Sequence, residues 1–275
     1  MAEPPVEDMR NIRYEQSGGA VTIVLDRPER RNAYSTAMLA ELMWAVEQAA
    51  ADERARVIVL RGAGTGFCAG DDLHGMGGLP DGFAFEPASL RGQQFNVLKA
   101  HLELQTTLRA AQKPTVAAIH GFAIGVGLDT AMACDLRVAT TDAIIWDPRP
   151  AERGMHSATG VAYHLPRAIG LTKAMEMIML AREYSGEEAA AIGLVTKAVP
   201  AESFEAELGE LVERLAQGPT KTFGVLKTQV YAGLGLSHRE AMELGRRLLA
   251  EVQIGDRAEG IQAFLEKRPP RFTGR

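Results

Sequence analysis

Short apolar runs and apolar residues at helical spacing alternate along much of the chain. Residues 14–33 contain a Gly-Gly turn and then an apolar run rich in β-branched residues that ends before Pro28, which predicts a hairpin followed by a loop. Ser35 precedes apolar residues three and four positions apart, so it is a candidate N-cap for a helix. The continuous apolar runs within 55–62 and 113–121 are typical of strands covered on both faces. This alternation of strands and helices predicts an α/β fold.

Glycine-rich segments join the elements in the middle of the chain. Residues 74–92 are rich in glycine and are expected to form an irregular loop, followed by a helix over 93–112. The segment 121–135 predicts a glycine turn that opens a helix, and 136–146 predicts two short strands.

The C-terminal third has a different character. After residue 170 nearly all of the patterning is helical, and only 194–199 resembles a strand. We therefore expect a disordered lead-in over 1–12, a core over 13–200, and a helical region over 201–275 that takes part in association between subunits.

Composition narrows the classes of function. The chain has 275 residues, is 46% hydrophobic and carries a net charge of −5 at pH 7, which argues against nucleic acid or an anionic membrane as its main partner. No stretch is apolar enough to span a membrane, and the first residues lack the pattern of a secretory signal, so a cytoplasmic protein is expected. Cys68 and Cys134 lack the spacing of a zinc site and are expected to be free, buried thiols in a reducing compartment.

Two glycine loops carry the candidate chemistry. The first, Gly62–Leu73, follows a predicted strand, and the second, Gly121–Asp129, follows another strand and opens a helix. Glycine permits a close backbone approach, and a helix N-terminus adds unpaired N–H groups at the positive end of the helix dipole. Neither loop matches a dinucleotide fingerprint or a P-loop. The two loops could therefore supply one N–H donor each to one carbonyl or developing oxyanion, and a turn with tight helix packing is the structural alternative.

Four ordered segments resemble the enoyl-CoA hydratase/isomerase (crotonase) superfamily. They are RPERRNAYS (27–35), FCAGDDL (67–73), IHGFAIGVGLDTAMACDLRVAT (119–140) and AMEMIMLAREYSGEEAAAIGLVTKAVP (174–200). The resemblance implies a crotonase-like α/β spiral of ββα units with a C-terminal helical region, assembled as a trimer or a dimer of trimers. It also implies an acyl-CoA thioester as substrate, with no metal and no cofactor apart from the coenzyme A of the substrate.

The resemblance implies that two backbone N–H groups hold the thioester oxygen. By motif position these belong to Asp71, just after the glycine of FCAG, and to Val126, in the middle of the glycine turn. The family usually has a small residue at both places, so Asp71 adds a carboxylate beside a site that stabilises negative charge. Relatives often use basic residues of the RPERRNA turn for the CoA phosphates. The expected contacts with acyl-CoA are Arg27, Arg30, Ala69, Gly70, Asp72, Leu73, Gly125, Trp146 and Pro150.

The acid positions of the family are only partly filled. In the hydratases two glutamates flank the double bond, where water must be activated and the α-carbon must receive a proton. The first position is Asp129, and counting back from Gly154 makes the second Pro150, which can neither transfer a proton nor donate an N–H. A further acid position in isomerases and dehalogenases is Ala158 here.

The catalytic candidates within reach by sequence are therefore Asp129, Asp147, Glu152 and His156. Asp129 is expected to act as the acid–base group, with Glu152 and His156 as candidates for the missing group. Ion pairing with neighbouring arginines is the structural alternative for Glu152, and complementing the helix dipole is the alternative for Asp129.

Other side chains have a structural explanation at this stage. His120 is expected to be a hydrogen-bonded structural residue, whereas His101 lies in a region where some relatives carry a catalytic histidine. His74 and Arg91 bracket the long glycine loop, and either solvent exposure or closure over the acyl chain fits them. The Met-rich stripe over 175–180 is expected to pack in the core or between subunits.

Several reactions fit these residues. Hydration is the activity that the overall resemblance suggests first, within fatty acid metabolism, through an oxyanion-stabilised thioester enolate. Double-bond isomerisation fits a single surviving carboxylate, and hydrolysis of an acyl-CoA or β-diketone type would use His156 or Glu152 to activate water. Pro150 favours a non-catalytic acyl-CoA binder, whereas a purely structural module would leave the glycine loops unexplained.

Overall fold

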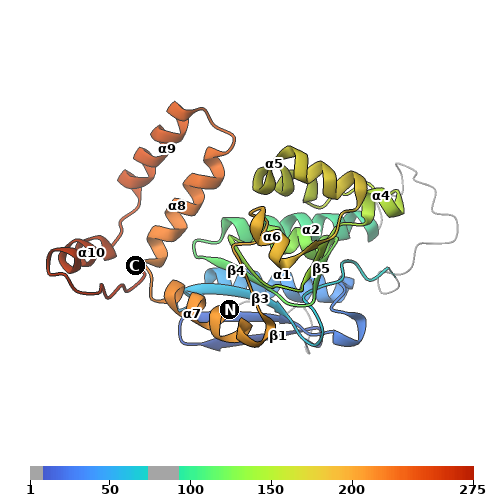
Figure 1. Cartoon of the computed structure of the whole chain (residues 1–275). Helices are drawn as coiled ribbons and strands as arrows, with labels where there is room; N and C mark the ends of the chain where they lie inside the picture. The colour runs from blue at the N-terminus through green and yellow to red at the C-terminus, as the bar shows by residue number, and fades with distance from the viewer. Residues whose placement is uncertain (1–8, 74–92) are drawn as a thin grey trace.

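A sheet of six strands forms the centre of the molecule (Figure 1). The computed structural model describes residues 9–73 and 93–275. The strand order is β1-β2-β3-β4-β6-β9, in which β1 is antiparallel to β2 and all other neighbours are parallel. The predicted hairpin and the two predicted buried strands are confirmed. The strands are β1 (Ile12–Ser17), β2 (Ala20–Leu25), β3 (Val57–Gly62), β4 (Thr115–Ile119), β6 (Leu136–Thr140) and β9 (Lys197–Val199).

Helices cover both faces of this sheet, which explains why its central strands β3 and β4 are mostly apolar. Ile58 and Leu60 of β3 belong to a large core shared with α1, α2, α3 and α5. Val57 and Val59 point to the opposite face, because side chains alternate along a strand, and they pack in a second core with α7. These helices are α1 (Thr36–Ala51), α2 (Gln93–Ala110), α3 (Val126–Ala133), α5 (Val161–Leu180) and α7 (Phe204–Ala216).

Helix α1 begins as its sequence predicts. The Ser35 side chain accepts a hydrogen bond from the backbone N–H of Met38 at 3.2 Å, which satisfies a donor that has no partner within the helix. This cap fixes the start of α1, which directly follows the RPERRNA turn.

A second, smaller sheet gives the fold its spiral form. Its strands β5, β7 and β8 pair in that order, with β5 parallel to β7 and β7 antiparallel to β8. The chain passes from β4 to β5 and then α3, and from β6 to β7 and then α4 and α5, so each unit gives one strand to each sheet. These are the predicted ββα units. The additional elements are β5 (Phe122–Ile124), β7 (Ile144–Trp146), β8 (Tyr184–Ser185), α4 (Arg149–Arg153) and α6 (Gly186–Ala191).

The C-terminal helices extend away from the sheets (Figure 1). The buried Lys227 ammonium attaches α8 to the core by donating to Asp135 Oδ2 and to the Leu108 carbonyl, both at 2.8 Å. The Tyr231 hydroxyl donates to Asp135 Oδ1 at 2.7 Å. These helices are α8 (Thr220–Gly233), α9 (His238–Glu251) and α10 (Asp256–Leu265).

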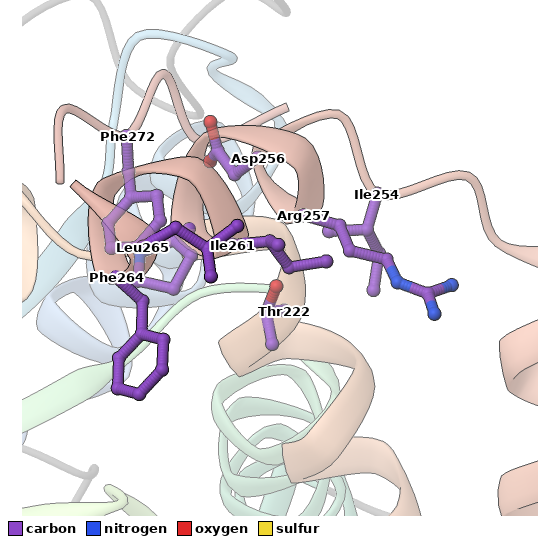
Figure 2. Close-up of a pocket in the computed structure, with 10 residues that line it drawn as sticks. Thr222, Ile254, Asp256, Arg257, Ile261, Phe264, Leu265 and Phe272 are labelled. Atoms are coloured by element: carbon purple, nitrogen blue, oxygen red, sulfur yellow. The ribbon is translucent and has the colours of Figure 1, made fainter.

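An apolar cavity of about 500 Å³ lies between α8 and α10 (Figure 2). Thr222 of α8 and Ile261 of α10 line it together with Phe272 of the C-terminal segment. Phe264 and Leu265 also line it and are 80% and 73% exposed. Large apolar side chains grouped on a surface are typical of a contact with another protein surface.

Some predictions fall outside the described residues or differ in detail. The predicted lead-in lies mainly on residues 1–8, although Ile12 already belongs to β1. The predicted loop over 74–92, with His74 and Arg91, also lies outside them. The Met-rich stripe is divided, because Met177 is fully buried whereas Met179 is 63% exposed.

Both cysteines are free and buried, as predicted. Burial raises the pKa of the Cys68 thiol and of the Cys134 thiol to about 12. Both groups are therefore protonated thiols at neutral pH and behave as small apolar side chains.

Gly127 allows α3 to pack closely against the first glycine loop, which yields a stability prediction. A methyl group at this position would lie 2.6 Å from the Cys68 carbonyl oxygen and 2.8 Å from its Cβ. We expect Gly127→Ala to lower the free energy of unfolding by about 1–3 kcal/mol, because the loop or the helix must shift. Urea unfolding monitored by circular dichroism measures this change.

The matched control is Gly209→Ala in α7, where an added methyl group meets nothing within 4 Å. Alanine favours a helix, so this variant should be more stable by about 0.5–1 kcal/mol. If Gly127→Ala behaved like the control, the close packing of the loop on α3 would be contradicted.

Candidate functional site

The first glycine loop follows β3 and is fixed on both sides of Asp71. The Tyr34 N–H donates to the Gly70 carbonyl at 2.8 Å, and the Asp72 N–H donates to the Tyr34 carbonyl at 2.9 Å. The wholly buried Asn32 donates from its amide to two carbonyls of the same loop, each at 2.8 Å. The backbone at Asp71 is therefore held in a defined conformation.

The second glycine loop ends beside the first. Gly125 has a φ of 58°, a conformation that favours glycine, and its N–H donates to the Trp146 carbonyl at 3.0 Å. Helix α3 begins at the next residue, Val126. A Cβ atom on Gly70 would lie 3.9 Å from the backbone nitrogen of Val126. The fold thus brings the backbones of Asp71 and Val126, the two predicted N–H donors, close together.

Asp129 lies one helical turn beyond Val126 and is fully buried. Its Oδ2 accepts hydrogen bonds from the Thr159 hydroxyl at 2.5 Å and from Arg149 Nη2 at 2.9 Å. Its Oδ1 is also buried and has no hydrogen-bond partner among the described residues. Burial raises the pKa of Asp129, and the positive charge of Arg149 opposes that rise. One oxygen is therefore held in place, while the other has no hydrogen-bond partner among the described residues.

Arg149 connects Asp129 to a second buried carboxylate. Its Nε and Nη2 atoms donate to the two oxygens of Asp147 at 2.7 Å and 2.9 Å, which is a bidentate ion pair. Its Nη1 donates to the Thr159 hydroxyl at 2.6 Å, and its side chain is only 11% exposed. The Thr159 hydroxyl therefore accepts a hydrogen bond from Arg149 and donates one to Asp129. The guanidinium fixes the position of both aspartates.

Pro150 fits the start of a short helix, at the position where the family has its second glutamate. It is the second residue of the short helix α4, where a missing N–H costs no hydrogen bond within the helix. Glu152 and His156 are exposed, as is Ala158. The neighbouring Arg149, which could have paired with Glu152 at the surface, is turned toward the buried aspartates instead.

The Asp71 side chain contacts His101 of α2. The His101 Nε2 atom lies 2.9 Å from Asp71 Oδ1. The His101 side chain is fully buried, whereas that of Asp71 is 27% exposed. The predicted structural role of His120 is confirmed, because its Nε2 lies 2.9 Å from the Gly64 carbonyl oxygen.

The comparisons with known proteins agree with this architecture. The sequence profile described as "Enoyl-CoA hydratase/isomerase" matches residues 15–275. The chain belongs to the enoyl-CoA hydratase/isomerase family. It is an enzyme of the hydratase/isomerase type, which acts on acyl-CoA.

Individual relatives cover nearly the whole chain. A protein named "Probable enoyl-CoA hydratase" from Rhodobacter capsulatus is 38% identical over 265 residues, which cover 96% of this chain and 98% of that one. The 1,2-epoxyphenylacetyl-CoA isomerase of Escherichia coli is 32% identical over 260 residues, covering 94% and 96%. A crystal structure of enoyl-CoA hydratase from Bacillus anthracis has a TM-score of 0.85 at 29% identity, covering 97% and 100%. These similarities confirm the family and the fold class.

The two arginines predicted to meet the CoA phosphates differ in environment. The Arg27 guanidinium is 15% exposed and donates to the Ala33 carbonyl at 2.7 Å and to Asp72 Oδ2 at 3.0 Å. Arg30, in a short 3₁₀ helix over Pro28–Arg30, is exposed. In this structure Arg27 ties the RPERRNA turn to the first glycine loop, and Arg30 extends into solvent.

The other predicted acyl-CoA contacts are distributed around the two loops. The Ala69 N–H donates to the Arg31 carbonyl at 3.1 Å, and the Leu73 side chain is 47% exposed. The Trp146 indole N–H donates to the Ala181 carbonyl at 2.9 Å. Their contact with acyl-CoA stays a prediction, together with that of Gly70, Asp72, Gly125 and Pro150.

A chain of polar side chains leads from the site to α8. The Gln105 amide donates to the Thr159 carbonyl, and its Oε1 lies 3.0 Å from His164 Nε2. The His164 Nδ1 atom lies 3.3 Å from Arg109 Nη1, and Arg109 stacks 3.8 Å from the centre of the Tyr231 ring. Because Arg109 can only donate, we assign the His164 proton to Nε2. Helix α2, which carries both Gln105 and Arg109, therefore links the site to α8.

The sequence alone does not single out Arg149 and Thr159 as parts of the site. Arg149 follows Asp147 by two residues in a proline-rich segment, a pattern that fits an exposed turn equally well. The signal that could have found it is the need of a buried Asp129 for a positive partner. Among residues 9–73 and 93–275, no group of three or more His, Cys, Asp or Glu side chains could hold a metal ion. Within the same ranges, no helix is both long and apolar enough to cross a bilayer.

The burial of His164 yields a pH prediction. Burial, with the nearby arginine charges, lowers the pKa of His164 from 6.5 to about 4. The unfolded chain therefore binds a proton at a higher pH than the folded chain does. The stability associated with neutral His164 is complete above pH 6.5 and declines as the pH falls toward 4, by about 3 kcal/mol in total.

His164→Gln keeps an amide donor for Gln105 and removes the titration. We expect the wild-type free energy of unfolding to fall more steeply than that of the variant between pH 6.5 and 4, in urea titrations at fixed ionic strength. Parallel pH profiles of the two proteins would contradict a neutral, buried His164.

Proposed function

We propose that this enzyme catalyses the hydration of an enoyl-CoA thioester, with Asp129 as an acid–base group in an atypical set. The half-held carboxyl of Asp129 carries this proposal: Oδ2 is fixed by Thr159 and Arg149, and Oδ1 is buried without a partner among the described residues. A carboxyl group whose pKa is raised by burial is suited to hold a proton and to give it to carbon. In hydration this proton goes to Cα of the acyl group.

The backbone N–H groups of Asp71 and Val126 are proposed to hold the thioester oxygen. When water adds at Cβ, the electron pair of the double bond moves toward that oxygen, and two fixed N–H donors stabilise the charge that develops. The short distance from a Cβ atom placed on Gly70 to the Val126 nitrogen supports this role. The position of Asp129 one turn further along α3 supports proton transfer to the adjacent carbon.

Arg27 and Arg30 are proposed to contact the CoA phosphates, and the exposure of Arg30 supports its part in this contact. Ala69, Gly70, Asp72, Leu73, Gly125, Trp146 and Pro150 are proposed to surround the pantetheine and acyl groups. Glu152 and His156 stay candidates for the second acid–base group. Both are exposed on or just after α4, which leaves them accessible to a water molecule.

Isomerisation of a double bond is the second candidate function. Pro150 removes one carboxylate of the usual pair, and Asp129 alone could carry a proton from one carbon to another. The description of the matching family, enoyl-CoA hydratase/isomerase, supports this alternative.

We also propose a homotrimer or a dimer of trimers in the cytoplasm. The exposed apolar side chains of α10, among them Phe264 and Leu265, support burial against another subunit.

The reaction class is tested by incubating the purified protein with a panel of enoyl-CoA thioesters in heavy water and analysing the products by mass spectrometry. Hydration adds one molecule of heavy water to the ester, and one of its deuterium atoms stays bound to carbon. Isomerisation leaves the elemental composition of the ester unchanged apart from exchanged deuterium. Release of free acid would indicate a hydrolase. Bound but unchanged esters would contradict both proposed reactions and indicate a binding protein.

Asp129→Asn tests the acid–base assignment. The amide keeps the shape of the side chain but cannot carry the proton, so we expect kcat to fall by about 10²–10⁴-fold. The exposed Asp142→Asn is the matched control and should keep wild-type kcat. Circular dichroism of both variants checks their folding. Unchanged turnover in folded Asp129→Asn would remove Asp129 from the mechanism.

A further inference from the structure

The Asp71 carboxylate is a charged group that has no role in the reaction proposed above. Its backbone N–H is one of the two proposed oxyanion donors, so the side chain begins beside the reacting thioester. An unused negative charge there would oppose the enolate. Either this carboxylate is held away from the substrate for structural reasons, or it takes part in the chemistry.

His101 holds one oxygen of this carboxylate and leaves the other accessible. Its Nε2 lies 2.9 Å from Asp71 Oδ1, and no other hydrogen bond to the Asp71 side chain occurs in the described parts of the chain. The Asp71 side chain keeps 27% of its surface exposed, although its partner is fully buried. A purely structural pair would gain by burying both members or by satisfying both oxygens.

The environment of His101 makes it a donor to Asp71. Its Nδ1 is buried and has no hydrogen-bond partner among residues 9–73 and 93–275. A lone pair at Nδ1 costs less than an unpaired buried N–H, so we assign the proton to Nε2, which donates to Asp71. The Tyr34 ring lies 5.6 Å from the imidazole and limits its movement. His101 thus sets the direction of the Asp71 carboxylate.

We propose that the Asp71 carboxylate, held by His101, is the second acid–base group of this site and activates the water that adds to the enoyl thioester. The inference rests on the proposed hydratase function. It places the group that Pro150 cannot supply on the first glycine loop. Asp129 on α3 and Asp71 then form a pair of carboxylates, one fully buried and one in contact with solvent.

The proton transfers balance over the cycle. Asp71 accepts a proton from water while a lone pair of the water oxygen forms the bond to Cβ, and the electron pair of the double bond moves to the thioester oxygen. The enolate then returns this electron pair to Cα, which takes the proton of Asp129. Water has been added, Asp71 has gained a proton and Asp129 has lost one. Transfer of that proton from Asp71 to Asp129 through a water molecule restores the starting state.

Two reactions distinguish the role of the Asp71 carboxylate from that of Asp129. Exchange of the α-hydrogen of a saturated acyl-CoA in heavy water needs Asp129 and the oxyanion donors, but it needs no water activation at Cβ. We expect Asp71→Asn and Asp71→Ala, which keep the backbone N–H, to lose 10²-fold or more in kcat for hydration and to keep α-exchange within a few fold. Asp129→Asn should lose both reactions.

His101 is tested as a positioning residue by a conservative and a disruptive variant. His101→Gln keeps a donor for Asp71 and should retain more of the hydration kcat than His101→Leu, with little change in KM for either. In an Asp71→Asn background the two should differ much less. Circular dichroism checks that each variant is folded.

Several outcomes would overturn the inference. Wild-type hydration in both Asp71 variants would do so, as would a selective loss of hydration in Glu152→Gln or His156→Gln with Asp71→Asn unaffected. Loss of both reactions in folded Asp71→Asn and Asp71→Ala would also count against a separate role at Cβ. By contrast, normal α-exchange in Asp129→Asn would refute the proposed function itself.

Discussion

The buried ion pair network of Arg149 is the interaction on which the arrangement of the site depends. Two fully buried carboxylates, Asp129 and Asp147, share one guanidinium, and Thr159 completes the hydrogen bonds around Asp129. Moving these charges out of water is costly, and breaking such a pair by removing one partner typically costs about 3–5 kcal/mol. The network therefore has little freedom to rearrange. Asp129 is held in one orientation because its Oδ2 already accepts two hydrogen bonds.

Most of the fold followed from sequence patterns, for a physical reason. Strands buried on both faces have to be apolar at every position, so β3 and β4 could be recognised from uninterrupted runs, and Ser35 could be recognised as a cap from its chemistry. Strand β8 has only two residues, Tyr184 and Ser185, and exists because β7 offers it a partner. Such an element has no local pattern to detect. Its formation depends on a contact between segments distant in sequence.

The same distinction applies to the site. The adjacency of Asp71, Val126 and Asp129 could be anticipated, because each lies in a glycine loop or on the helix that such a loop opens. Where the side chains point could not be anticipated. Arg149 faces inward and the Asp71 carboxylate faces His101 because of tertiary contacts with α3 and α2. Motif position therefore located the candidate residues, whereas their charge environment required the structure.

Cys68 lies at the point where the two loops meet. Its sulfur accepts a hydrogen bond from the Gly70 N–H at 3.4 Å, and a methyl group on Gly127 would lie 3.0 Å from it. Alkylating reagents need both access and a thiolate, and this thiol has neither in the folded state. It reacts only in molecules where the packing around it has opened. Cys68 is thus a native chemical probe, and its labelling rate, measured separately from that of the other buried thiol, Cys134, reports how often the region between the two glycine loops opens.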